Sequence, residues 1–164
     1  MCLKDDTVGI AGMNHFVLPE AVSRDKIITS DSGRFGIHAM ELLINEMIVR
    51  GASRKRLWAK VFGGGHVLRA IDTSRIPDAN VEFSLLFLET EGIAVRAKDV
   101  GGNNGRKILF HTDTGMVQVV KIQQSQIQEV NMKEEWLKKR IRRSDDGSGF
   151  TVFDRRTPSL RNPV

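Results

Sequence analysis

Ile10–Pro19, Ile-Ala-Gly-Met-Asn-His-Phe-Val-Leu-Pro, is the stretch that decides the fold. It is an apolar run with one imidazole, His15, near its middle and a proline at its end. Such a run is typical of a strand covered on both faces, and proline ends it because proline cannot donate a ladder hydrogen bond. We therefore expect His15 to be buried in a sheet. Because a buried histidine is unusual, His15 is the first candidate for chemistry.

Outward from this stretch, helix patterns alternate with strand patterns. Apolar side chains between Ile37 and Ile48 recur at the three- and four-residue spacing of one helix face. Asp31 or Ser32 can cap this helix, and Gly51 suits the left-handed position after its end. A second helix is expected over residues 80–91. Strands are expected over 7–11, 13–18, 57–62, 93–97, 107–111 and 116–122, the last two joined by a turn that contains Gly115.

The order of these elements predicts the fold class. Strands come first, then helix, strand and helix, and a hairpin follows. Helices that lie between strands favour an α/β fold with a mixed sheet.

Composition limits the protein class. The chain has 164 residues with 40% hydrophobic and 27% charged side chains, which suits one soluble domain. No apolar run reaches the roughly 18 residues of a membrane span, and Met1–Asp6 lacks the apolar centre of a secretory signal. A single cysteine cannot form an internal disulfide. We expect a cytoplasmic protein.

The net charge of +5 is concentrated near the end of the chain. Residues 133–164 contain nine Lys/Arg and five Asp/Glu, a net of +4, which leaves +1 for the rest. A nucleic-acid-binding protein more often carries its basic stripe on the folded body. We therefore interpret 126–164 as a basic, partly disordered extension with a short helix at 133–141, although a nucleic-acid-associated module using this tail stays a distant alternative.

Metal and phosphate sites are not indicated by the motifs. The histidines have no metal-ligand spacing toward each other or toward Cys2. The run Gly63-Gly64-Gly65 follows a strand but lacks the Lys-Ser/Thr or the helix-opening pattern of phosphate loops. It indicates a tight turn or a close approach of the backbone to a neighbour or ligand. Gly101-Gly102-Asn103 repeats this pattern, and backbone amides in such loops can line a substrate pocket or stabilise an oxyanion.

Two interpretations of His15 stay open from the residues alone. It is either a core imidazole bonded to a backbone carbonyl or a general base beside a thiol, because a cysteine must lose its proton to attack at neutral pH. Cys2 is the one thiol in the sequence. Spacing does not show that it reaches His15, and a small buried residue at a strand start is the simpler interpretation.

Several stretches, taken together and in order, resemble the CheD family of chemoreceptor glutamine deamidases. They run from Cys2 to about Ile122 and are 12–19 (Gly-Met-Asn-His-Phe-Val-Leu-Pro), 40–47 (Met-Glu-Leu-Leu-Ile-Asn-Glu-Met), 60–64 (Lys-Val-Phe-Gly-Gly), 80–82 (Asn-Val-Glu), 88–93 (Leu-Glu-Thr-Glu-Gly-Ile) and 101–107 (Gly-Gly-Asn-Asn-Gly-Arg-Lys). Each piece is weak alone, but the ordered set is specific.

The resemblance implies an α/β/α sandwich related to cytotoxic necrotizing factor toxins, here over residues 1–125. It also implies a cysteine–histidine pair with His15 as the histidine. A thiolate would attack the amide carbon of a receptor glutamine, ammonia would leave, and water would release glutamate. No metal or organic cofactor is implied. The implied partners are methyl-accepting chemoreceptors and a CheC-type phosphatase. We assign substrate binding to Gly63, Gly64, Gly101, Gly102 and Asn103.

The sequence departs from the family pattern at the nucleophile. In the family, the nucleophile lies in a Gly-Ser-Cys-Val motif, and a second, non-catalytic cysteine follows four residues later. Cys2 matches the second position, so the nucleophile would lie ahead of Met1. A start site or cloned fragment that begins too far downstream is the favoured explanation, followed by a non-catalytic adaptor of the same fold. Substitution by Cys2 is least favoured, because four strand positions correspond to ~13 Å.

Overall fold

A mixed four-stranded sheet forms the centre of the computed structural model, which describes residues 1–18, 20, 23–27, 29–67 and 75–122. Its strands are β1 (Cys2–Asp5), β2 (Ile10–Met13), β3 (Leu57–Gly63) and β4 (Ala94–Val100), in the order β2-β1-β3-β4. Strand β1 pairs antiparallel with β2 and β3, whereas β3 and β4 are parallel. Strand β2 is therefore an edge strand, with no neighbouring strand on its outer side among the described residues of this sheet. His15 comes two residues after the end of β2.

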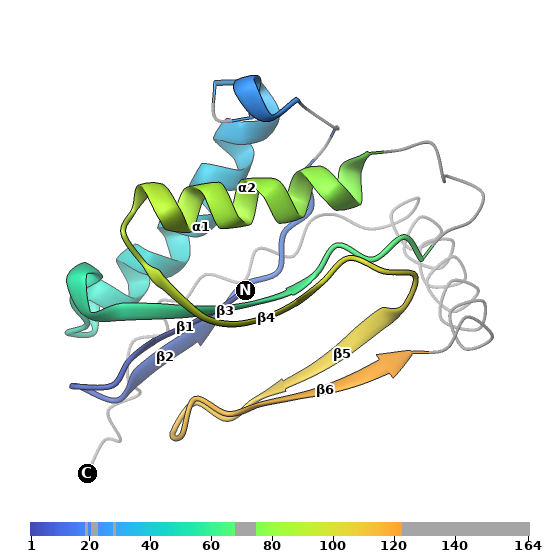
Figure 1. Cartoon of the computed structure of the whole chain (residues 1–164). Helices are drawn as coiled ribbons and strands as arrows, with labels where there is room; N and C mark the ends of the chain where they lie inside the picture. Colours follow the sequence, from blue (N-terminus) through green and yellow to red (C-terminus); the bar gives the residue numbers. More distant parts are fainter. Residues whose placement is uncertain (19, 21–22, 28, 68–74, 123–164) are drawn as a thin grey trace, which may run out of the picture. The chain divides into compact units, whose positions relative to one another are not determined.

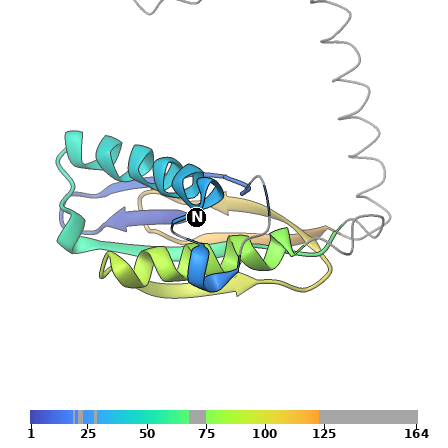
Figure 2. The same ribbon diagram turned by 90° about the horizontal axis from the view of Figure 1, so that it is seen from above.

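Two helices cover one face of this sheet. Helices α1 (Asp31–Val49) and α2 (Ile76–Thr90) lie side by side above the strands, as Figures 1 and 2 show. Short 3-10 turns occur at Arg24–Lys26 and Arg54–Arg56. Between the helices and the sheet lies the apolar core, which includes Leu3, Leu18, Ile27, Met40, Ile44, Ala59, Phe83 and Leu88.

A separate hairpin, β5 (Gly105–Phe110) and β6 (Val117–Ile122), lies on the opposite side of the sheet from the helices (Figure 1). Its turn is fastened by two lysines. Lys4 Nζ donates to the Asp113 carbonyl at 2.9 Å, and Lys60 Nζ donates to the Gly115 carbonyl at 2.8 Å. A side chain at 115 would clash with the Trp58 ring, since a Cβ there would lie 2.7 Å from it. The hairpin therefore packs closely on the strands.

The α/β class and the mixed sheet are confirmed. Within the described residues the layers are helices, sheet and hairpin, rather than helices on both faces. Helix α2 begins four residues before the predicted start, because Pro77 lies in its first turn, where no amide donor is needed. Helix α1 is capped by Ser30, which accepts a hydrogen bond from the Gly33 amide, and not by the predicted Asp31 or Ser32.

The first two strands differ from the prediction. Asp5 Oδ1 accepts a hydrogen bond from the Thr7 amide, and Gly9 has a φ of +69°. Together these residues form the turn between β1 and β2 where a strand over 7–11 was predicted. The predicted strand over 13–18 is also wrong, because β2 ends at Met13.

Neither α1 nor α2 combines the length and hydropathy that a bilayer-spanning helix requires, and they are the only α-helices among the described residues. The basic extension and its predicted helix lie outside the described residues.

Candidate functional site

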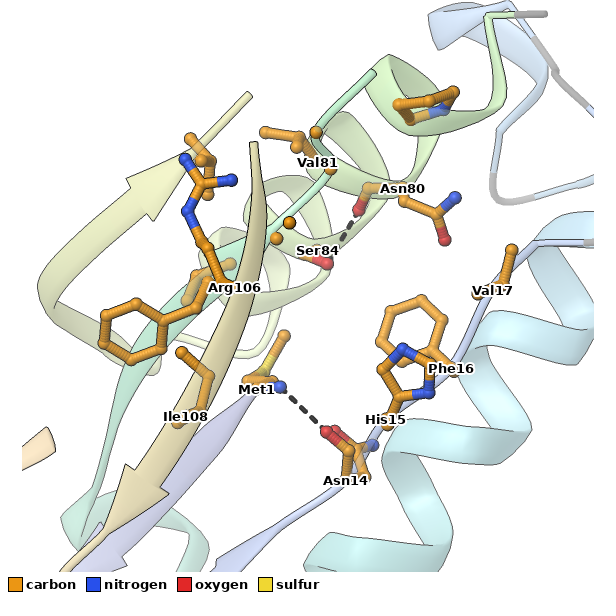
Figure 3. Close-up of a pocket in the computed structure, with 18 of the residues that line it drawn as sticks. Met1, Asn14, His15, Phe16, Val17, Asn80, Val81, Ser84, Arg106 and Ile108 are labelled. Atoms are coloured by element: carbon orange, nitrogen blue, oxygen red, sulfur yellow. Dashed lines mark hydrogen bonds between the residues drawn. The ribbon is translucent and has the colours of Figure 1, made fainter. Parts of the chain in front are cut away.

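A cavity of about 790 Å³ opens where the first strands, the end of β3, the start of α2 and the hairpin meet. Figure 3 shows His15 and Met1 on one side of it, Asn80, Val81 and Ser84 on α2, and Arg106 and Ile108 on β5. The remaining lining residues are mainly apolar side chains, together with the backbone of the loop Gly63–Gly65. The cavity thus combines an apolar wall with a few polar groups, as binding sites in proteins usually do.

His15 lies in this cavity wall, but not as predicted. Its side chain is exposed, in an irregular extended segment, Asn14–Leu18, that follows β2. A side chain at Gly12 would meet α1, and Asn14 bonds to α1. Because side chains alternate along an extended chain, His15 faces away from that helix. The expected burial is wrong, since the segment continues from β2, which is an edge strand of the sheet, and a cavity lies beside the imidazole.

The segment that carries His15 is fixed at both ends by amide side chains. Asn14 Nδ2 donates to the Ala39 carbonyl of α1 at 3.0 Å. At the other end, the Leu18 amide donates to Asn80 Oδ1 of α2 at 2.9 Å. The segment that carries the imidazole is therefore anchored to both helices.

Cys2 lies in the wall of the same cavity. It is opposite Met13 in the β1–β2 ladder, and Met1 and Asn14 continue the ladder by exchanging two backbone hydrogen bonds of 2.9 and 3.0 Å. Cys2 and His15 are thus diagonal neighbours on one face, which regular ladders separate by about 7–8 Å between Cα atoms. Burial raises the pKa of the Cys2 thiol, which is only 1% exposed, so the thiolate is disfavoured.

Gly63 and Gly64 line the cavity, and the conformation explains the glycines. Their φ angles are +124° and +64°, in a region that favours glycine. A Cβ at Gly64 would lie 2.3 Å from Val81 Cγ2 and 2.9 Å from the Pro77 carbonyl oxygen. The close backbone approach predicted for this loop is therefore confirmed, and the neighbour is the first turn of α2.

The second predicted glycine pair, Gly101 and Gly102, supports the loop that contains the first pair. The Gly101 amide donates to the Gly63 carbonyl at 2.9 Å, and the Gly102 carbonyl accepts from the His66 amide at 2.7 Å. Neither glycine lines the cavity, and neither does Asn103. This pair holds the cavity loop in place, so a role in substrate binding would be indirect.

Arg106 is a cavity residue that sequence reasoning missed, although it lies within the motif that carried the resemblance. Its side chain is 6% exposed and donates to Asp99 at 2.7 Å and to the Gly101 carbonyl at 2.9 Å. The guanidinium holds the pKa of Asp99 below its usual range. Asn80 and Ser84 were also missed as cavity residues, because one turn of helix separates them in sequence and no motif links them.

The other histidines are not gathered around His15. His38 is exposed on α1, and His66 Nε2 lies 3.1 Å from Asp78 Oδ1 at the start of α2. The His111 Nε2 atom is buried in the hairpin without a hydrogen-bond partner among the described residues. Within that same part of the chain, no three His, Cys, Asp or Glu side chains are arranged to hold a metal ion.

Comparison with known proteins places this chain in a family. The family model described as CheD chemotactic sensory transduction matches residues 17–121. A protein of Laribacter hongkongensis named "Probable chemoreceptor glutamine deamidase CheD" is 43% identical over 148 residues, which cover 90% of this chain and 72% of that protein. A protein of the same name from Stenotrophomonas maltophilia is 40% identical over 153 residues, covering 93% and 75%. Another from Paraburkholderia xenovorans is 46% identical over 125 residues, covering 76% and 50%. The chain belongs to the CheD family.

Proposed function

We propose that this protein deamidates glutamine side chains of chemoreceptors in bacterial chemotaxis, with His15 as the general base. The observation that carries the proposal is an exposed imidazole in the wall of a cavity of about 790 Å³, held on a segment anchored at both ends. The names of the relatives support the substrate class. The proposed setting is the cytoplasm, and no cofactor is required.

The reaction uses a thiol and a base. His15 takes the proton of the thiol, and the sulfur attacks the amide carbon of the glutamine. The carbon–nitrogen bond breaks, and the imidazolium returns the proton so that ammonia leaves. His15 then takes a proton from water, whose oxygen attacks the thioester, and the products are glutamate and the free thiol. Backbone groups at Gly63 and Gly64, which line the cavity, are proposed to contact the substrate. Gly101 and Gly102 would act indirectly by holding this loop, and Asn103, which does not line the cavity, would take part only through a rearrangement.

The β1–β2 register bears on which thiol acts. Since Cys2 is opposite Met13, a residue directly before Met1 would be opposite His15. The family's nucleophile, four positions before Cys2, would then be diagonal to His15 on one side, as Cys2 is on the other. Register alone does not separate the two thiols, because both positions would be equally close to His15 although ~13 Å of strand lies between them. Burial and the raised pKa of the thiol weigh against Cys2.

The test compares the 164-residue chain with one extended before Met1 by Gly-Ser-Cys-Val-Ala. Each is incubated with a chemoreceptor cytoplasmic fragment, and ammonia release and a gain of about one dalton per modified glutamine are measured, since –NH₂ becomes –OH. The extended chain should be active. His15→Ala should abolish the activity, whereas His38→Ala, on the exposed side of α1, should preserve it. An extended chain that is inactive, or an active His15→Ala variant, would contradict the proposal.

Cys2→Ser decides between the two thiols. It should preserve the activity of the extended chain, and loss of that activity would assign the nucleophile to Cys2. In-frame codons for Gly-Ser-Cys upstream of the Met1 codon would independently support the family's position.

A non-catalytic adaptor is the second candidate, favoured by the burial of the only cysteine in this sequence. Such an adaptor would bind chemoreceptors, or a CheC-type phosphatase, without releasing ammonia. Receptor capture by both chains, without any mass change in the receptor, would favour this function. The CheC-type phosphatase is proposed as a partner in either case, and its binding should compete with that of the receptor.

A further inference from the structure

Within the part of the chain that the structure describes, the backbone around His15 is hydrogen-bonded at its two ends and not between them. Among the described residues, the amides of residues 15–17 donate no hydrogen bond, whereas Asn14 and Leu18 are both bonded. Phe16 adds an edge-to-face contact with Phe83 at 5.6 Å between ring centroids. The position of the imidazole therefore depends on how firmly the two ends are fixed.

The far end is fixed by a side chain that is itself fully engaged. Asn80 Oδ1 accepts from the Leu18 amide at 2.9 Å, and its Nδ2 donates to the Ile76 carbonyl at 2.7 Å. Its backbone carbonyl accepts from Ser84 Oγ at 2.7 Å. Both ends of the amide are in use, so rotating it would break two bonds. Leu18, the residue it holds, is only 1% exposed.

We propose that Asn80 is the positioning residue of His15. By fixing the Leu18 amide to α2, it sets where the segment that leaves the sheet after Met13 ends, and thus how the imidazole is placed in the cavity wall. Asn80 also lines that cavity, but its amide is committed to the protein rather than to a ligand. The catalytic meaning of this role rests on the proposed function, whereas the structural role does not. A misplacement of the base by about 1 Å is enough to cost roughly 10–100-fold in rate.

The side chain offers a conservative variant. Asn80→Asp retains an oxygen acceptor for the Leu18 amide but loses the donor to Ile76. Asn80→Ala loses both. Glu82→Ala, on the same helix and outside the cavity lining, is the control. If Asn80 only stabilised α2, the hydrogen bond that matters would be the one from Nδ2 to the Ile76 carbonyl. Both Asn80→Asp and Asn80→Ala lose that bond, so the aspartate variant would then behave like the alanine variant.

The first measurement is made by NMR on the full chain and needs no activity. In the unsubstituted protein, the Leu18 amide should exchange with solvent at least about tenfold more slowly than the Val17 amide. Asn80→Ala should remove this protection and shift or broaden the His15 ring resonances, and Asn80→Asp should restore both. Equal exchange of the two amides, or unchanged His15 resonances in Asn80→Ala, would overturn the proposal. The comparison within the unsubstituted chain stays decisive even if Asn80→Ala does not fold.

The second measurement is kinetic, on whichever chain is active. Asn80→Ala should lower kcat about 10–100-fold with little change in KM, with recovery in Asn80→Asp and no change in Glu82→Ala. An increase in KM at constant kcat would instead assign Asn80 to substrate binding and overturn positioning. If neither chain releases ammonia, the proposed function fails, and the NMR results still decide the role of Asn80.

Discussion

Gly64 lies where the cavity wall meets the first turn of α2, and its lack of a side chain permits that contact. Two features disfavour a side chain at this position: the φ of +64° and the close approach of the backbone to Val81 and Pro77. The neighbouring atoms belong to a helix backbone and a branched side chain, so they have little freedom to move aside. The shape of the cavity wall at this point therefore depends on residue 64 having no Cβ atom.

Gly64→Ala should therefore destabilise the protein by about 3 kcal/mol, through backbone strain and overpacking together. Gly102→Ala is the matched control, since it has a similar φ of +71° but open space around its Cβ. It should cost only about 1–2 kcal/mol, the penalty for the left-handed conformation. Urea unfolding of both variants measures the difference, and equal losses would show that the contact with α2 is unimportant.

Asp5 is a second residue whose side chain joins distant parts of the chain. Its buried carboxylate accepts hydrogen bonds from the amides of Thr7 and Ser53 and from Arg56 Nε. Bonding to Arg56 is the main cause that lowers the pKa of Asp5 to about 2. The charged form thus joins the first turn of the chain to the start of β3.

This lowered pKa predicts acid sensitivity. A carboxylate with a lower pKa in the folded state contributes stability above its unfolded pKa of about 4, and loses it as the pH falls toward 2. The urea midpoint should therefore drop between about pH 4 and pH 2, and Asp5→Asn should flatten that part of the profile while lowering stability at pH 7. The control Asp31→Asn, with an exposed carboxylate, should retain the drop. An unchanged profile in Asp5→Asn would assign the acid sensitivity to other groups.

Between elements, Arg54 joins the middle of α1 to the end of α2. Its guanidinium bonds to both Glu41 oxygens of α1, at 3.0 and 2.7 Å, and to Glu91 at the end of α2. These side chains are about one-third exposed or less, so water screens the pairing only in part. One cation thus sets the spacing of the helices at the end opposite Asn80.

Arg54→Met should lower the free energy of unfolding by about 1–2 kcal/mol, because it leaves two neighbouring carboxylates without their shared partner. Arg34→Met, which removes an exposed pair with Asp31, should cost less than about 0.5 kcal/mol. Thermal and urea unfolding at low and high salt provide the measurement. If the two arginines had equal effects, the three-residue network would add nothing to an ordinary surface pair.

At the level of the whole molecule, we expect the basic extension to be dispensable. The described core, with its cavity, is built from residues before 123. Removal of 133–164 should leave the unfolding midpoint and chemoreceptor binding unchanged, as measured by circular dichroism and by titration with a receptor fragment. A loss of binding would mean that the tail takes part in recognition, and a recovery of affinity at low salt would identify the contribution as electrostatic.

Sequence patterns predicted the elements whose cause is local. Helix α1 follows from the apolar spacing between Ile37 and Ile48, and the β5–β6 turn follows from Gly115, which has a φ of +74°. The first hairpin was predicted wrongly because its turn depends on the Asp5 carboxylate, whose other partners are about 50 residues away. No local pattern contains such a contact.

In the site, too, features with a local cause were predictable from the sequence, and features that depend on distant parts of the chain were not. Composition and motif singled out His15 and the glycines 63–64, because rare residue types in an apolar context are visible in sequence. The exposure of His15 was not visible, since it depends on β2 being an edge strand, which is a property of the whole sheet. Asn80 and Arg106 act through backbone carbonyls and amides, which carry no sequence signature.

The lysine anchors of the hairpin turn have a consequence for diversification. Lys4 and Lys60 reach the oxygens of peptide units, which every amino acid possesses, so the loop at 113–115 can change its side chains and still dock. Two positions of the turn are constrained: Gly115 by the indole of Trp58, and Thr114 because its Oγ1 accepts a hydrogen bond from the Met116 amide at 3.2 Å. Because the same hairpin supplies Arg106 and Ile108 to the cavity through β5, these anchors also hold one cavity wall against the sheet while leaving the other exposed turn side chains free to vary.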